Sequence, residues 1–256
     1  MTLRQRLHDP AIALLSVVGF ILFWLVLAWA KADPKILPTP MVVATEIWSE
    51  AANGDLAKHV GATLFRVSVA FGLAMVIGGI IGTLLGRMPR LDRWLDPWIV
   101  IFLNIPALVI IVLCYLWIGL NEIAAITAVT LNKAAMVLVT MREGSRVIDP
   151  RLDDMAQVFR MPRAVWLRHV LLPQLSPFLA TAARNGLSVI WKVVLVVEFL
   201  GRSNGVGFQI HLRFQLFDIP GVMAYAISFV GVMLVIDYAM IQPLERRATQ
   251  WRRATA

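Results

Sequence analysis

The sequence predicts an all-α integral membrane protein with about six transmembrane helices. Of its 256 residues, 59% are hydrophobic and only 16% are charged, and the mean hydropathy is +0.74. Soluble domains contain about 45–50% apolar and about 25% charged residues, so a chain this apolar cannot cover a soluble globule with polar groups. Residues 11–30 carry no charge and can cross the hydrocarbon core at about 1.5 Å per residue. These observations argue against a soluble enzyme.

Apolar runs separated by polar segments give six candidate spans. The first run ends at Ala28-Trp29-Ala30, so a cleaved signal peptide is a competing interpretation. Signal sequences have apolar regions of about 7–15 residues, and the longer run here favours a retained span. The predicted spans cover residues 11–30, 64–85, 98–118, 123–141, 178–200 and 222–241. We expect residues 1–256 to form a single transmembrane domain.

Prolines and glycines shape the first connection and the second span. Three prolines within residues 31–40 preclude a continuous helix, so we expect an extended connector there and a short surface helix over residues 45–49. The second span carries glycines at every fourth position, namely Gly78, Gly82 and Gly86. Small residues at this spacing let a neighbouring helix approach closely, which predicts a helix–helix contact.

Basic residues orient the predicted chain. With six spans both termini lie on one side, and fifteen Lys and Arg residues fall on that side against five on the other. Cytoplasmic loops carry an excess of Lys and Arg, so we expect both termini in the cytoplasm. The net charge of +8 then reflects loops that face anionic membrane lipid, and no nucleic-acid partner is expected.

The sequence lacks motifs for catalysis or nucleotide binding. It contains no Gly-Lys dipeptide, and therefore no Walker A loop, and also no His-Glu-x-x-His or Gly-x-Ser-x-Gly pattern. Its lone cysteine, Cys114, rules out an intramolecular disulfide and a cysteine-based zinc site. The four histidines are scattered without ligand spacing. We therefore expect a conduit without catalytic residues, metal ligands or a bound cofactor.

The longest polar connection, residues 142–177, contains two predicted short helices. The pair Asp149-Pro150 is a favourable helix start, and two aspartates follow in the first turn, where the helix dipole favours carboxylates. Pro162 disfavours helical geometry just before it, so the first helix should end near Arg160, and a second should cover residues 163–169. A solvated loop and a docking element for a cytosolic partner fit this pattern equally well.

The same segment resembles the EAA loop of ABC-transporter permeases. That loop usually reads Glu-Ala-Ala, three residues, Gly and, further on, a proline; here Asp154-Met155-Ala156 and Leu171-Leu172-Pro173 occupy the two ends. Other stretches, in order from about residue 37 to the C-terminus, resemble the branch that serves nitrate, sulfonate and taurine importers. They are Leu37-Pro38-Thr39-Pro40, Asn104-Ile105-Pro106, Trp117-Ile118-Gly119, Val147-Ile148-Asp149-Pro150-Arg151-Leu152, Glu198-Phe199-Leu200-Gly201 and Gly205-Val206-Gly207.

The resemblance implies a type I ABC importer permease fold in a bacterial inner membrane. It implies a dimeric permease core, with a homodimer as the simpler expectation, that forms the path for a small anionic solute delivered by a periplasmic binding protein. Residues 142–177 would form the cytoplasmic coupling loop and dock on a pair of cytosolic ATPase subunits, which use ATP and Mg. The implied coupling residues are Asp153, Asp154, Met155, Ala156, Arg160, Met161, Pro162 and Pro173.

Three residues depart from the usual EAA loop. Asp154 stands where Glu is usual, Met155 replaces the first Ala, and Arg160 occupies the Gly position. A glycine there permits a left-handed turn, which arginine resists. Pro162, two residues later, offers another route to the bend. These departures concern the docking geometry and the choice of ATPase partner.

Charged residues also fall within the predicted spans, namely Lys133, Arg184, Lys192, Glu198 and Asp237. A charge in the bilayer is costly, so such residues normally face protein or water. We hypothesise that Lys192 lines the translocation path and helps an anionic substrate to cross. The alternative is a structural pairing with Asp237 or a backbone carbonyl. Glu198 is assigned to the same path, either as a gate residue or as a helix-packing contact.

A secondary transporter is the competing function, and a membrane-embedded enzyme is a further one. A secondary transporter would need an ion-coupling site and usually carries internal repeats, and no clear repeat relates the halves of this chain. A membrane-embedded enzyme would need clustered His or Asp within the spans. A requirement for a separate ATPase discriminates both from an ABC permease.

Overall fold

The computed structural model describes residues 10–31, 33 and 36–241, and each regular element among them is a helix. The predicted all-α class is therefore confirmed. In chain order the α-helices are α2 (Pro10–Lys31), α3 (Pro40–Ala52), α4 (Asp55–Arg87), α5 (Pro89–Asn104), α6 (Ala107–Ile118), α7 (Glu122–Arg146), α8 (Pro150–Val158), α9 (Arg163–Trp166), α10 (Leu172–Gly201), α11 (Val206–Gln215) and α12 (Ile219–Ile236). Two π-helical turns, η1 (Leu167–Leu171) and η2 (Asp237–Ile241), adjoin α10 and α12.

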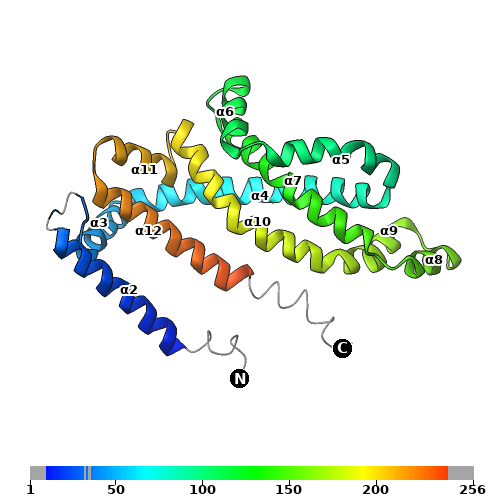
Figure 1. The fold of residues 1–256 in the computed structure, drawn as a ribbon, viewed down its shortest axis with the longest axis horizontal. Coiled ribbons are helices and arrows are strands. Elements are labelled where there is room, and N and C mark those ends of the chain that lie inside the picture. The colour runs from blue at the N-terminus through cyan, green and yellow to red at the C-terminus, as the bar shows by residue number, and fades with distance from the viewer. Residues whose placement is uncertain (1–9, 32, 34–35, 242–256) are drawn as a thin grey trace.

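Helices α4 and α7 run in parallel through the middle of the bundle, and α10 crosses them (Figure 1). The glycines of α4 lie directly on the backbone of α7. A Cβ atom added at Gly82 would stand 2.3 Å from the carbonyl oxygen of Leu138, and one at Gly78 would stand 2.5 Å from that of Ala134. No side chain larger than hydrogen fits this seam without moving a helix, which confirms the predicted contact.

The third predicted span, residues 98–118, is not one continuous helix. Helices α5 and α6 meet at an angle of 94°, and the break falls at Ile105 and Pro106. Proline cannot donate a backbone hydrogen bond, and it drives the residue before it into an extended conformation; Ile105 accordingly has ψ 122°. The predicted span is therefore broken into two helices, because these two effects act together in the middle of the apolar run.

Four of the described helices are long and apolar enough to cross a membrane, or five if the bent pair is one span. They are Leu14–Lys31, Asp55–Arg87, Glu122–Arg146 and Ile219–Ala239. Helix α10, which contains the fifth predicted span, is 30 residues long but carries Arg184, Lys192 and Glu198. Helix α10 is therefore long enough to cross a membrane, but it is not among the four helices whose length and composition together fit a span.

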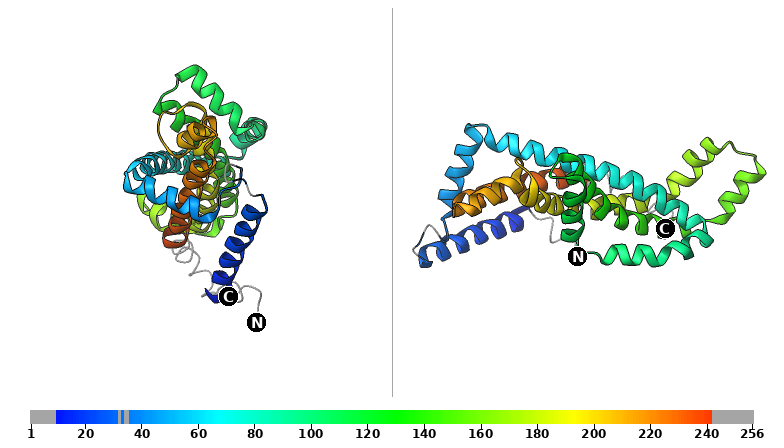
Figure 2. Two further views of the ribbon diagram at one scale, coloured as in Figure 1. Left: turned by 90° about the vertical axis from the view of Figure 1, so that its left-hand side faces the viewer. Right: turned by 90° about the horizontal axis from the view of Figure 1, so that it is seen from above.

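The two ends of the bundle differ in construction. At one end α8 and α9 project beyond the end of α4, and at the other α3 and α11 close the bundle (Figure 2). The predicted helix start at Asp149 is confirmed, because its carboxylate accepts a hydrogen bond from the Arg151 backbone N–H at 2.9 Å. The predicted short surface helix is longer than expected and forms α3, which Thr39 caps.

Candidate functional site

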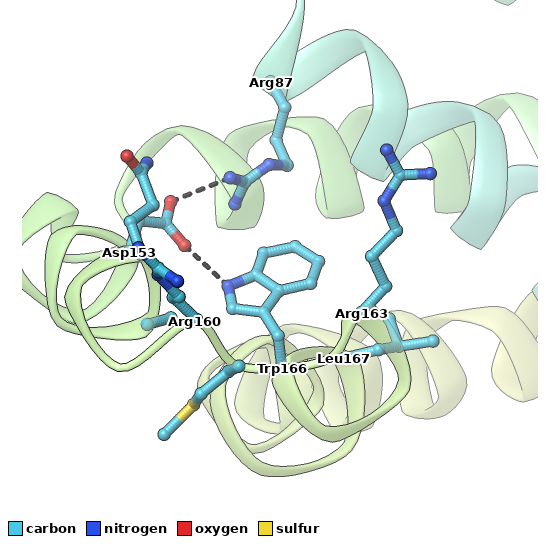
Figure 3. Close-up of a pocket in the computed structure, with 9 residues that line it drawn as sticks. Arg87, Asp153, Arg160, Arg163, Trp166 and Leu167 are labelled. Atoms are coloured by element: carbon cyan, nitrogen blue, oxygen red, sulfur yellow. Dashed lines mark hydrogen bonds and ion pairs between the residues drawn. The ribbon is translucent and has the colours of Figure 1, made fainter.

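The knob, by which we mean α8, α9 and the turn between them (residues 150–166), is tied to the end of α4 (Figure 3). Asp153 of α8 connects to Arg87 of α4 and to Trp166 of α9. Its carboxylate accepts a hydrogen bond from Nη2 of Arg87 at 2.8 Å and another from Nε1 of Trp166 at 2.9 Å. The Arg87 guanidinium also lies 4.8 Å from the centre of the Trp166 ring, a favourable cation–π contact. Movement of the knob is therefore linked to α4.

The turn between α8 and α9 is a Schellman cap with Arg160 in the left-handed position. The φ angle of Arg160 is +47°, and its N–H donates to the carbonyl of Gln157 at 3.0 Å. The N–H of Met161 donates to the carbonyl of Ala156 at 2.9 Å. Glycine usually occupies this position. The bend therefore comes from Arg160 itself, and the alternative route through Pro162 was wrong, since Pro162 instead precedes α9 as its N-cap.

The predicted coupling residues do not all share one surface. Ala156 is buried and Asp153 points toward α4, whereas Asp154 and Arg160 are exposed; Pro173 lies in the first turn of α10, outside the knob. The prediction missed the apolar tip of the knob. There Val158 is 79% exposed and Phe159 is 72% exposed. Two adjacent apolar residues at the end of a polar helix were the sequence signal for this tip.

A pocket of about 490 Å³ lies between the knob and α4. Three arginines line it, from α4, the turn and α9, and one carboxylate does so, that of Asp153. The complete lining is Arg87, Asp153, Ala156, Gln157, Arg160, Met161, Arg163, Trp166 and Leu167. We call this the basic pocket.

Helix α10 carries a polar stripe on its exposed side. Each member has another member three or four residues away, which places them on one face of the helix. They are Thr181, Arg184, Asn185, Ser188 and Lys192, all of them exposed. The stripe lies within a segment whose opposite face packs into the apolar core through Leu187, Ile190 and Val194. This face is the polar side of an otherwise membrane-compatible helix.

Lys192 lines a pocket of about 380 Å³ between α10 and α12. Asn185 and Ser188 of the stripe line this pocket, as do Trp191 and Asp237. The Lys192 ammonium lies 5.5 Å from the centre of the Trp191 ring, and this contact, rather than an ion pair with Asp237, is the one the structure forms. The pocket thus presents two basic side chains, those of Lys192 and Arg184, beside an aromatic ring and one carboxylate, that of Asp237.

A second lysine lies behind the stripe. Lys133 of α7 is only 1% exposed, and its Nζ contacts the backbone carbonyl of Asn185 at 3.4 Å and Sδ of Met136 at 3.3 Å. Among the residues that the structure describes, no carboxylate forms an ion pair with Lys133. The back of the stripe is therefore also basic.

Glu198 is placed differently from Lys192, although both were assigned to the path. Its side chain is completely buried and accepts hydrogen bonds from Nη1 of Arg66 at 2.6 Å, from Thr63 at 2.9 Å and from the N–H of Gly207 at 2.8 Å. It lines neither the basic pocket nor the pocket beside Lys192. Of the two roles considered for Glu198, this geometry is that of a helix-packing contact.

Arg66 is the centre of a larger group, the Arg66 cluster, which sequence reasoning missed. All three nitrogens of its guanidinium donate hydrogen bonds: Nε and Nη2 donate to Glu122 at 2.8 Å and 2.5 Å, and Nη1 donates to Glu198 at 2.6 Å. Arg202 donates to Glu122 at 2.7 Å. The members are Arg66, Glu122, Glu198, Arg202 and Asn204, from α4, α7, α10 and the loop after it. The cluster ties three long helices to the loop before α11.

A separate group at the same end holds α3 against α11. Arg213 forms ion pairs with Glu46 at 3.0 Å, with Asp218 at 2.6 Å and with Glu50. Burial lowers the pKa of Arg213, but the hydrogen bond to Asp218 and the charges of Glu50 and Asp218 outweigh this and raise its pKa above the ordinary value. Arg213 is therefore a fixed positive charge. Within residues 10–31, 33 and 36–241, no three His, Cys, Asp or Glu side chains gather in an arrangement that could hold a metal ion.

Comparison with known proteins places the chain in a family. Residues 74–249 match the family described as binding-protein-dependent transport system inner membrane component. A putative aliphatic sulfonates transport permease protein, SsuC of Bacillus subtilis, is 29% identical over 217 residues, covering 85% of this chain and 78% of the relative. The taurine transport system permease protein TauC of Escherichia coli is 26% identical over 234 residues, covering 90% and 85%.

Solved structures show the same fold. A chain of the MetNI methionine ABC transporter in an inward-facing conformation aligns with a TM-score of 0.64, at 20% identity, and covers 74% of this chain and 94% of its own length. The family match favours an ABC permease over the alternative of a secondary transporter. This chain belongs to the binding-protein-dependent transport system inner membrane components, and it is an ABC importer permease of the nitrate, sulfonate and taurine type.

Proposed function

We propose that two copies of this chain form the translocation path for a small anionic solute, and that the polar stripe on α10 lines that path. The observation that carries this proposal is the exposure of Asn185, Ser188 and Lys192 on one face of a helix long enough to span the membrane. Polar and charged side chains within a membrane face protein or water rather than lipid. A water-filled path between two permease copies satisfies this requirement.

The charge of the stripe supports an anionic substrate. Lys192 contacts an aromatic ring, and Lys133 lies directly behind Asn185, so a solute at the stripe passes two basic side chains. The relatives named for aliphatic sulfonates and for taurine support the same chemical class. On this proposal Lys192 contacts the solute during passage, while Glu198 keeps the outer ends of the helices in place.

The remaining subunits supply energy and substrate. The knob docks on a pair of cytosolic ATPase subunits, which bind ATP and Mg, and a periplasmic binding protein delivers the solute at the other end. Docking of the knob uses its exposed residues Asp154, Arg160 and Pro162 together with the apolar tip, while Asp153 and the buried Ala156 hold the knob in shape. On this proposal both termini lie in the cytoplasm, the Arg66 cluster lies near the periplasm, and residues 142–177 form the cytoplasmic coupling loop. Two identical docking loops match two ATPase subunits.

Transport by the reconstituted complex tests the proposal. The permease, its ATPase and its binding protein are placed in liposomes, and ATP-dependent uptake of radiolabelled aliphatic sulfonate is measured for wild type, Lys192→Met and the control Lys31→Met at the end of α2. We expect Lys192→Met to lower the uptake rate about tenfold, because it removes the charge that contacts the anion. Equal uptake by wild type and Lys192→Met contradicts the path assignment. Uptake without any ATPase contradicts the coupling scheme.

A further inference from the structure

The basic pocket contains more positive charge than the knob itself can compensate. Figure 3 shows Arg160 and Arg163 on either side of Trp166, with Arg87 and Asp153 between the knob and α4. The Asp153 carboxylate is already engaged, because Arg87 pairs with one oxygen and Trp166 donates to the other. Over the part of the chain that the structure describes, neither Arg160 nor Arg163 forms an ion pair. Two guanidinium groups therefore face the pocket without an anion.

Arg160 is held there in a conformation that is unfavourable for arginine. Its φ of +47° lies in the left-handed region, where a residue with a Cβ atom costs about 1–2 kcal/mol more than glycine. Glycine would complete the same Schellman cap without that cost. A strained residue at an exposed turn points to a use for its side chain. Here the only feature that the side chain adds is a guanidinium at the pocket.

We propose that the basic pocket receives an acidic side chain of the ATPase, which pairs with Arg160 and Arg163. The proposal rests on the proposed docking of the knob and specifies its chemistry. The neighbouring tip, Val158 and Phe159, supplies an exposed apolar contact beside the pocket. An interface of this kind combines an apolar anchor with a charge pair that is shielded from water, and the charge pair sets which partner fits. The ATPase groove should accordingly carry an Asp or Glu next to an apolar surface.

Binding of the purified ATPase to the purified permease in detergent tests the proposal, with the dissociation constant measured at low and high salt. The variants are Arg160→Gln, Arg163→Gln and Arg160→Gly, and the matched control is Arg168→Gln, an exposed arginine of η1 that does not line the pocket. We expect Arg160→Gln and Arg163→Gln each to weaken binding about tenfold and to reduce its salt dependence. The control should change binding less than twofold.

Arg160→Gly separates the proposal from a merely structural role. Because glycine relieves the left-handed strain, this variant should unfold at a higher temperature than wild type and yet bind the ATPase about tenfold more weakly. Binding by Arg160→Gly equal to that of wild type overturns the proposal. A reciprocal test strengthens the assignment: Arg160→Glu should lose binding and regain it when the acidic residue of the ATPase is changed to Lys.

Two other results have distinct meanings. If wild type fails to bind the ATPase, the proposed docking of the knob is wrong and the basic pocket has no such partner. If all arginine variants bind the ATPase normally but lose binding to vesicles of phosphatidylglycerol, the pocket recognises an anionic headgroup, and the acidic-side-chain proposal is overturned while the docking of the knob stands.

Discussion

Two charged residues of α10, Glu198 and Lys192, differ in how many hydrogen bonds and ion pairs the protein provides for them. Glu198 is fully buried and accepts hydrogen bonds from Arg66, Thr63 and the backbone of Gly207. Lys192, six residues earlier on α10, is exposed, and its ammonium lies near the aromatic ring of Trp191. A charge that the protein satisfies internally fixes helices, whereas an exposed charge within a membrane helix requires water or a partner. Composition alone treats the two residues alike, but their surroundings assign them opposite roles.

The same contrast recurs at the knob. The Asp153 carboxylate accepts hydrogen bonds from Arg87 and Trp166 and so joins α8 to α4 and α9. Arg160 and Arg163, in contrast, line the basic pocket at the surface. In both regions the paired carboxylate, Glu198 or Asp153, lies between helices that must keep their relative positions. The open groups lie where a solute or another subunit is expected. Measuring stability and function on the same variants tests this division.

The largest effect should come from the Arg66 cluster. Arg66→Met leaves Glu122 and Glu198 without their shared cation, and breaking a buried pair in this way costs about 3–5 kcal/mol. We expect a large fall in the thermal unfolding temperature in detergent and a low yield of dimer. Arg168→Gln, at an exposed position, serves as the control. A normal unfolding temperature for Arg66→Met would show that the cluster is not structural.

Lys133 provides a case between the two groups, since it is buried but has a carbonyl and a sulfur atom rather than a carboxylate as partners. Lys133→Met keeps most of the side-chain volume and removes the cost of burying an ammonium. We therefore expect stability to rise by about 2 kcal/mol, measured as a higher unfolding temperature. Lower stability would reveal that Lys133 is paired in the assembled transporter and belongs with the saturated charges.

The helices were largely predictable, but the charge clusters were not. Long apolar runs and caps such as Asp149 are local signals, and the structure confirms the helices that they predict except over residues 98–118, where α5 and α6 are bent apart. In the Arg66 cluster, Glu122 and Glu198 follow Arg66 in the sequence by 56 and 132 positions, and helical spacing cannot predict contacts over such separations. Arg160 shows another limit: the sequence marked the position as one for glycine, but only the structure shows that the left-handed turn persists with an arginine in it.

Asp153→Asn should have a smaller effect than either buried change. The Arg87–Asp153 pair is partly exposed, with side chains 32% and 23% accessible, so solvent screens it. The neutral amide keeps an oxygen for Trp166 and loses the ion pair, which predicts a loss of about 1 kcal/mol in the free energy of unfolding. Glu143→Gln, in a more exposed pair with Arg146, is the control and should change stability less. A larger loss for the control would mean that exposure does not rank these pairs.

The smallest effect on stability should be that of Lys192→Met. An exposed side chain that only contacts a ring contributes within about 0.5 kcal/mol, so the unfolding temperature of this variant should match that of wild type while its sulfonate uptake falls. This combination is what distinguishes a path residue from a member of a structural cluster. If Lys192→Met instead destabilised the dimer as much as Arg66→Met, Lys192 would be saturated by the second copy. The contrast between the two groups on α10 would then be a property of the isolated chain, and the path would have to run along another face.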